Sequence, residues 1–189
     1  PAWRSGHGRV RVLVSRWSLP TNMRVQAARW FEALKECTHS CLTPIILSSV
    51  EADAAWYIVP DPGGIALSKV LSRHGIPRIN WVVAVMSHVA SGLAELHKKG
   101  VLHLDIRPEV IQVDPITGIP KFASYGFYQP RGPLLRSVIR AESNLLTAAS
   151  ILAPELVDSS KPGQVDQGTD IYAFGATLYT LLAGTTPFT

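Results

Sequence analysis

Apolar residues near the start of the chain first follow the period of a strand and then that of a helix. Residues 9–17 alternate apolar and polar positions, and the apolar ones include Val10, Val12 and Val14. This two-residue period predicts a half-buried strand. From Thr21 or Asn22, either of which has a side chain suited to capping, apolar positions recur at helical spacing to about residue 37. The chain therefore opens with a strand followed by a helix.

Two short apolar runs and a breaker follow that helix. The runs cover residues 44–50 and 54–59, and the acidic turn between them predicts an antiparallel strand pair. Residues 60–64, with the sequence Pro-Asp-Pro-Gly-Gly, suit neither a ladder nor a helix. We expect a hinge there, between a strand-rich part at 1–59 and a helix-rich part at 65–189.

Helical periods dominate beyond the hinge. A short helix is expected over 66–74, and Asn80 is expected to cap a long helix that ends at Gly100. Residues 109–123 hold two short apolar runs around an Asp-Pro-Ile-Thr-Gly turn, which predicts a hairpin.

The last part of the chain combines a loop with a helix. Residues 127–152 lack a sustained period and contain two prolines, so a long loop is expected. A final helix is expected over 170–183, with its apolar residues on one stripe. Its apolar tract at 171–183 is shorter than the about 20 residues that cross a bilayer, so we expect a buried core helix and no membrane segment.

The composition is that of a folded chain with a modest basic excess. Hydrophobic residues make up 47% and charged residues 17%, which excludes a disordered chain. The net charge of +4 is spread along the sequence, so we expect a solvated basic surface and no nucleic-acid partner. Cys37, His39 and Cys41 lie close together, but no second Cys or His pair completes a zinc site. The cysteines are expected to pack as small hydrophobes in a reduced, cytoplasmic protein.

Four motifs follow one another in the second part of the chain. They are His103-Leu104-Asp105-Ile106-Arg107, Ser124-Tyr125-Gly126, Ala153-Pro154-Glu155 and Asp170-Ile171-Tyr172-Ala173-Phe174-Gly175. In this order and at these separations they resemble the protein kinase superfamily, and its bacterial-type serine/threonine branch most of all. The resemblance implies an α+β fold of two lobes, a small β-rich one and a helical large one, here expected to be truncated at both ends.

The resemblance also implies roles for the residues of the catalytic loop. Asp105 stands where active relatives accept the proton of the substrate hydroxyl, and Arg107 replaces the lysine that steadies the transferring phosphate. His103 and Tyr125 match a histidine and a phenylalanine that pack together. Leu104 replaces the arginine with which a phosphorylated activation segment pairs.

Other positions are assigned structural or binding roles by the same resemblance. Asp170 is expected to cap its helix and to accept hydrogen bonds from the catalytic-loop backbone. Gly126 and Glu155 are structural positions, and Glu155 is expected to lack the arginine partner that later helices supply. The adenine of a bound nucleotide would lie against the hinge residues Val59, Pro60 and Asp61.

Three positions depart from the pattern that phosphoryl transfer requires. Ser124 replaces the aspartate that holds the phosphate-bridging metal, and a hydroxyl is a weak ligand for a hard cation. Val110 replaces the asparagine that binds a second metal and cannot coordinate. Ser15 stands at the place of the strand lysine, and its neighbour Arg16 could substitute only through a bulge.

The glutamate that would pair with the strand lysine has no clear position. When the position of this glutamate is counted back along the sequence from His39, the count leads to Trp30. Glu32 fits only if a gap of two residues is allowed in that count. These departures predict a pseudokinase that binds a protein partner, with no confident cofactor and at most weak binding of ATP and magnesium. The alternative is an active serine/threonine kinase that acts on a protein substrate and recruits Glu109 or Asp114 to an atypical metal site.

Overall fold

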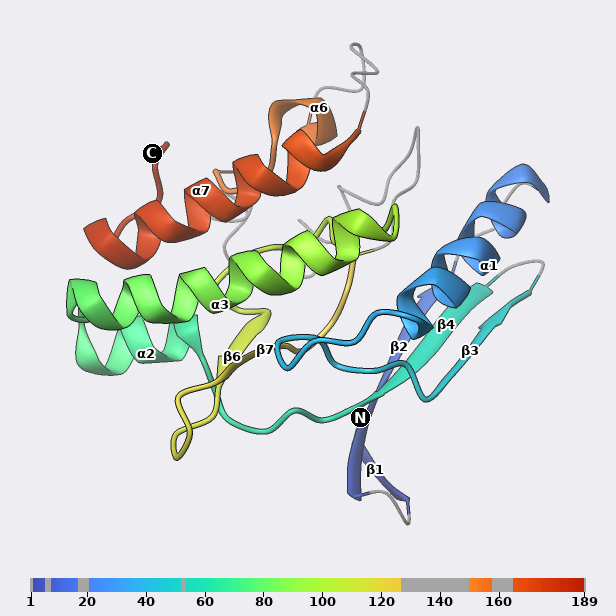
Figure 1. Cartoon of the computed structure of the whole chain (residues 1–189), viewed down its shortest axis with the longest axis horizontal. Helices are drawn as coiled ribbons and strands as arrows, with labels where there is room; N and C mark the ends of the chain where they lie inside the picture. Colours follow the sequence, from blue (N-terminus) through green and yellow to red (C-terminus); the bar gives the residue numbers. More distant parts are fainter. Residues whose placement is uncertain are drawn as a thin grey trace.

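A computed structural model of the chain describes residues 2–5, 8–16, 21–51, 54–126, 150–157 and 165–188. The predicted loop at 127–152 lies outside the described residues except for its last three positions. Figure 1 shows α1 and strands β2 to β4 on one side of the molecule and helices α2, α3 and α7 on the other. The two groups form the small and the large lobe of an α+β fold.

The small lobe contains a four-stranded antiparallel sheet in the order β1-β2-β4-β3, with one helix beside it. Its elements are β1 (Ala2–Ser5), β2 (Gly8–Arg16), α1 (Thr21–Lys35), β3 (Leu47–Val50) and β4 (Ala54–Pro60). The predicted strand, helix and antiparallel pair are confirmed. The pattern missed β1, because four residues with the sequence Ala-Trp-Arg-Ser are too few to show a period.

The large lobe combines helices with a small three-stranded sheet in the order β5-β6-β7. Its elements are β5 (Ile65–Ala66), α2 (Leu67–His74), α3 (Ile79–Lys98), β6 (Ile111–Val113), β7 (Pro120–Phe122), α6 (Pro154–Val157) and α7 (Gln167–Ala183). The predicted hairpin is β6–β7, and both predicted helices at 66–74 and 170–183 are present.

The start of α3 differs from the prediction. Arg78 is the N-cap residue of this helix and makes no side-chain capping bond, whereas Asn80 lies in the first turn. The prediction that Asn80 caps the helix is therefore wrong. The apolar period fixed the face of the helix but not the residue at which it begins, since helix ends are poorly defined by periodicity alone.

Helix α3 is the core helix of the large lobe. Its buried apolar side chains are Val82, Val85, Met86, Val89, Leu93 and Leu96. It contacts β7 and lies alongside α7 (Figure 1). In the described part of the chain it is the one helix whose length and mean hydropathy would also suit a membrane span, a test that core helices of this kind pass.

The connection between the lobes requires a glycine. Gly64 has a φ of +87°, and a Cβ at this position would lie 2.5 Å from the carbonyl oxygen of Val113. The next residue, Ile65, pairs with Val113 in the β5–β6 ladder. Glycine at 64 therefore lets the chain leave β4 and pass directly over β6.

Both cysteines are free and buried beside α3. Cys41 is 0% exposed, and burial raises the pKa of its thiol to about 12. The Nδ1 atom of His39 accepts a hydrogen bond of 3.1 Å from the backbone N–H of Cys41. This bond makes the imidazole of His39 part of the local turn. Among the described residues, no group of three or more His, Cys, Asp or Glu side chains is arranged to hold a metal ion.

Candidate functional site

The loop between α3 and β6 carries Asp105 and Arg107. The guanidinium Nε of Arg107 donates to Oδ1 of Asp105 at 2.6 Å, and its Nη1 lies 3.9 Å from Oε2 of Glu109. The side chains of Asp105 and Arg107 are 22% and 16% exposed, so both are partly shielded from water. The structure thus brings the two predicted catalytic residues together, but as a charge pair in contact with each other.

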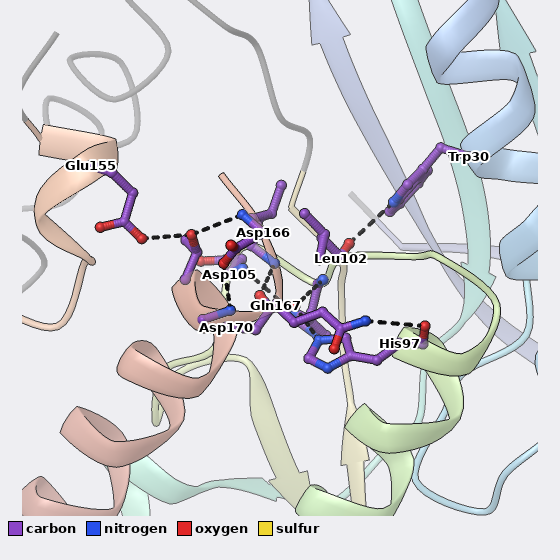
Figure 2. A network of polar contacts seen from close by, with 12 residues as sticks. Trp30, His97, Leu102, Asp105, Glu155, Asp166, Gln167 and Asp170 are labelled. Atoms are coloured by element: carbon purple, nitrogen blue, oxygen red, sulfur yellow. Dashed lines mark hydrogen bonds and ion pairs between the residues drawn. The ribbon is translucent and has the colours of Figure 1, made fainter. Parts of the chain in front are cut away.

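Asp170, on α7, binds the backbone of this loop through its carboxylate (Figure 2). Its Oδ1 accepts from the backbone N–H of Leu104 at 2.7 Å, and its Oδ2 accepts from the backbone N–H of His103 at 2.8 Å. The same Oδ2 accepts from Nε2 of His97 at 2.8 Å, and Asp170 is 0% exposed. The buried carboxylate of Asp170 therefore accepts two hydrogen bonds from the backbone of the catalytic loop.

The predicted capping role of Asp170 is wrong. The N-cap of α7 is Asp166, whose side chain accepts from the backbone N–H of Gly168 at 2.7 Å. Thr169 completes a capping box, since its hydroxyl accepts from the backbone N–H of Asp166. The helix starts at Gln167, three residues before the predicted start at 170, so Asp170 lies inside its first turn.

The bonds to Asp170 hold a strained backbone at Leu104. Its φ is +59°, the single positive value of a non-glycine residue in the described part of the chain. A left-handed conformation costs an ordinary residue roughly 1–2 kcal/mol, so surrounding contacts must impose it. The bond from the Leu104 N–H to Asp170 supplies such a contact and sets the direction of the chain at Asp105.

His103 and Tyr125 are both buried, at 0% and 3% exposure, and their ring centroids lie 5.2 Å apart. The His103 ring also lies 4.0 Å from that of Phe122. Burial lowers the pKa of His103 to about 4, against the opposing effect of nearby Asp170. The imidazole is therefore neutral near pH 7, and its Nδ1 accepts from the backbone N–H of Asp105 at 3.2 Å.

Gly126 passes directly over the catalytic loop. Its N–H donates to the carbonyl oxygen of His103 at 2.8 Å. A Cβ at this position would lie 2.8 Å from the carbonyl carbon and oxygen of Leu104, which are backbone atoms that cannot rotate away. The predicted structural role of Gly126 thus has a steric cause that the sequence does not show.

We expect Gly126→Ala to lower the free energy of unfolding by about 1–3 kcal/mol, because the added methyl group overpacks rigid backbone. Gly175→Ala is the matched control. Gly175 lies inside α7 with nothing within 4 Å of its Cβ position, so alanine there should stabilise the protein by up to about 1 kcal/mol. Urea denaturation of the two variants measures the difference, and equal values would contradict the proposed steric contact.

The two positions that would hold metal ions lie on paired segments. Val110 is 4% exposed, and its carbonyl oxygen accepts from the N–H of Ala123 at 2.8 Å, next to the half-buried Ser124. An apolar side chain therefore occupies one of the two metal positions and a neutral hydroxyl occupies the other. A hard divalent cation prefers several carboxylate or carbonyl oxygens, which these two side chains do not supply.

The carboxylates of the alternative metal site are already engaged. Glu109 is 42% exposed and pairs with Arg107 across 3.9 Å. Oδ1 of Asp114 accepts from the backbone N–H groups of Ile116 and Thr117, both at 2.8 Å, and these bonds lower the pKa of Asp114. Asp114 thus shapes the β6–β7 turn.

In the small lobe, the ladder between β2 and β4 is continuous. Ser15 pairs with Ala55 and Arg16 with Ala54, one residue against one. The bulge that would bring Arg16 to the place of Ser15 is therefore absent from this stretch of the described chain.

Helix α1 presents Trp30, and not Glu32, to the large lobe. The indole Nε1 of Trp30 donates to the carbonyl oxygen of Leu102 at 3.1 Å (Figure 2). Glu32 is 70% exposed and pairs with Lys35 at 2.7 Å. Sequence reasoning left both positions open, and only the orientation of the helix separates them.

The hinge residues differ in exposure. Val59 is buried, whereas Pro60 and Asp61 are partly exposed. Neither Pro60 nor Pro62 has a backbone N–H, and the N–H of Gly63 donates to Oδ1 of Asp61 at 3.3 Å. Few backbone donors are thus available to a ligand at this connection.

Glu155 has a partner that sequence reasoning missed. The hydroxyl of Thr169 donates to its Oε1 at 2.6 Å, so α6 is tied to the start of α7. A pocket of about 20 Å³ beside this contact is lined by residues that include Leu104, Arg107 and Leu156. That volume admits about one water molecule and is too small for a nucleotide.

The model of the protein kinase domain family matches residues 18–189. The chain belongs to the protein kinase domain family. It is 34% identical over 126 residues to the serine/threonine-protein kinase PknL of Mycobacterium tuberculosis, a match that covers 67% of this chain and 30% of PknL. It is 28% identical over 139 residues to PrkC of Bacillus subtilis, covering 73% of this chain and 20% of PrkC. The matched region is thus less than a third of these kinases.

Solved kinase structures share the fold. The kinase domain of Mycobacterium tuberculosis PknI has a TM-score of 0.71 at 21% identity, covering 95% of this chain and 66% of that one. Rad53 in complex with AMP-PNP has a TM-score of 0.69 at 15% identity, covering 96% and 43%. The two-lobed kinase fold expected from the motifs is therefore confirmed.

Proposed function

We propose that this kinase domain is a pseudokinase that serves as a binding or regulatory module for a protein partner. The observation that carries the proposal is the replacement of both metal ligands by side chains that cannot balance the charge of a triphosphate: Val110, which is 4% exposed, and the half-buried Ser124. Phosphoryl transfer depends on positioning and on cations that neutralise the phosphates. A site without these ligands retains the fold and loses the chemistry.

The pair between Asp105 and Arg107 supports the same proposal. At 2.6 Å the guanidinium neutralises the carboxylate that would accept a proton, and Glu109 adds a second negative group 3.9 Å away. Arg107 is thus surrounded by carboxylates instead of being free to meet a phosphate. We take Asp105 to act as part of the loop structure.

The alternative is an active serine/threonine kinase with an atypical metal site. The observation in its favour is Glu109, which is 42% exposed and adjacent to Val110. Its carboxylate would have to leave Arg107 and turn toward the metal position that Val110 occupies. The relatives PknL and PrkC are named serine/threonine-protein kinases, which keeps this alternative open.

A phosphate-transfer assay tests the proposal. We expect no transfer of labelled phosphate from ATP to the chain itself or to a general protein substrate, with an active serine/threonine kinase run alongside. Asp105→Asn is the matched variant and should give the same background. Strong labelling that Asp105→Asn abolishes would overturn the proposal.

Thermal denaturation provides a second measurement. We expect the same midpoint with ATP alone and with ATP plus magnesium, because binding to the folded state would raise the midpoint only if a metal-nucleotide site existed. A magnesium-dependent rise that Glu109→Gln removes would instead favour the active alternative.

A further inference from the structure

A tyrosine of the small lobe holds the backbone of a residue in the large lobe. Tyr57, on β4, is 0% exposed. Its hydroxyl accepts from the backbone N–H of Tyr125 at 2.7 Å and donates to the carbonyl oxygen of the same residue at 2.6 Å. One side chain thus satisfies both backbone groups of a residue 68 positions away.

Tyr125 returns the same type of contact to the small lobe. Its hydroxyl accepts from the N–H of Thr43 and donates to the carbonyl oxygen of Thr43, both at 2.9 Å. The hydroxyl of Thr43 donates to the carbonyl oxygen of Phe122, and the N–H of Phe122 donates to the carbonyl oxygen of Cys41 at 2.9 Å. Cys41 and Thr43 are therefore bonded to Phe122 and Tyr125, so the segments 41–43 and 122–125 are held together at two residues each.

Trp30 adds a third connection. Its bond of 3.1 Å to Leu102 joins α1 to the catalytic loop. Its ring lies edge-on to those of Tyr57 and Tyr125, with both centroid distances 6.3 Å. These aromatic contacts fix the helix against β4 and the segment after β7.

The contacts are costly to open. Tyr57, Tyr125 and Thr43 are all buried, so separating them would leave donors and acceptors without partners away from water. Burial also raises the pKa of both tyrosine hydroxyls above the ordinary value of 10, so they remain protonated donors at neutral pH. Every group involved belongs to the chain itself.

We propose that Trp30, Thr43, Tyr57 and Tyr125 form an interlobe clasp that holds α1, β4 and the segment after β7 in one arrangement without nucleotide, metal ion or phosphate. The clasp uses hydroxyl and indole groups whose partners are backbone atoms. The clasp goes beyond the proposed function, because the same contacts could hold the two lobes together around either a catalytically active or an inactive site. The outcome of the phosphate-transfer assay therefore does not decide it.

Amide hydrogen exchange on the nucleotide-free chain tests the clasp directly. We expect the amides of Thr43 and Tyr125 to be protected, and their exchange rates to be unchanged by ATP and magnesium. Tyr57→Phe keeps the ring and removes the hydroxyl, and we expect it to speed exchange at Tyr125 by about tenfold through local opening. Tyr125→Phe should do the same at Thr43.

Tyr179→Phe is the matched control, because Tyr179 lies on α7 with 48% exposure and should leave both amides unchanged. The wild-type measurement needs no variant, so the proposal stays testable even if a substitution prevents folding. Unprotected amides at Thr43 and Tyr125 in the nucleotide-free chain would overturn the clasp. So would protection that appears only after nucleotide is added, or a Tyr57→Phe variant that exchanges like wild type.

Discussion

Replacing Asp170 with alanine is expected to lower the free energy of unfolding by about 3–5 kcal/mol. The carboxylate is 0% exposed and accepts from the backbone N–H groups of His103 and Leu104 and from His97. Alanine would leave these donors without an acceptor and would release the strained backbone at Leu104. Urea denaturation measures the change.

Asp166→Ala separates this role from helix capping. Asp166 is the N-cap of the same helix, and loss of a capping side chain costs about 1 kcal/mol. We therefore expect the Asp170 variant to be several times more destabilised. Similar losses at the two positions would show that Asp170 contributes only as an acidic residue at the helix start. Asp170→Asn, which keeps one acceptor oxygen, should fall between them.

The second large effect is a loss of stability in mild acid that depends on His103. Burial lowers its folded-state pKa from 6.5 to about 4, so the unfolded chain binds the proton more readily. The stability that His103 contributes is present above pH 6.5 and is lost as the pH falls toward 4. Linkage gives a loss of about 2 kcal/mol between pH 7.5 and pH 5. Asp170 opposes this shift and His97 adds to it.

His103→Phe provides the comparison. Phenylalanine preserves the ring that packs on Phe122 and Tyr125 but does not titrate. The stability of this variant, measured by urea denaturation at pH 7.5, 6 and 5, should fall less steeply than that of the wild type. Phenylalanine removes the bond that Nδ1 of His103 accepts from the N–H of Asp105, but this loss applies at every pH and does not change the slope that is compared. The Nε2 atom of His103 has no hydrogen-bond partner among the described residues, so no bond is lost there. Parallel pH profiles for the two proteins would refute the assignment.

Several parts of the site could be predicted because they depend on local pattern. The order of the motifs around Asp105, Tyr125, Glu155 and Asp170 indicated the kinase fold, which the family match and the solved structures confirm. The predicted division at 60–64, the roles of Asp105 and Arg107, the hinge contact with adenine and the cytoplasmic location stay predictions.

Other features depended on contacts that a pattern cannot encode. The sequence contains both Trp30 and Glu32 near the expected position, and only the rotation of α1 turns the first toward Leu102 and leaves the second in water. Asp166 and Asp170 are both acidic residues near the start of one helix. Their roles differ because only Asp170 is buried against the catalytic loop.

The sequence alone determined most of the succession of strands and helices, and it determined the family. Each of these follows from the spacing of apolar residues or from short motifs, which act over a few neighbouring positions. The tertiary structure decided that Arg107 contacts Asp105, that Asp170 holds the catalytic loop, and that Tyr57 and Tyr125 bond across the lobes. The contacts of Asp170 and the two tyrosines join residues more than 60 positions apart. They arise because packing the two lobes buries polar groups that must then find partners.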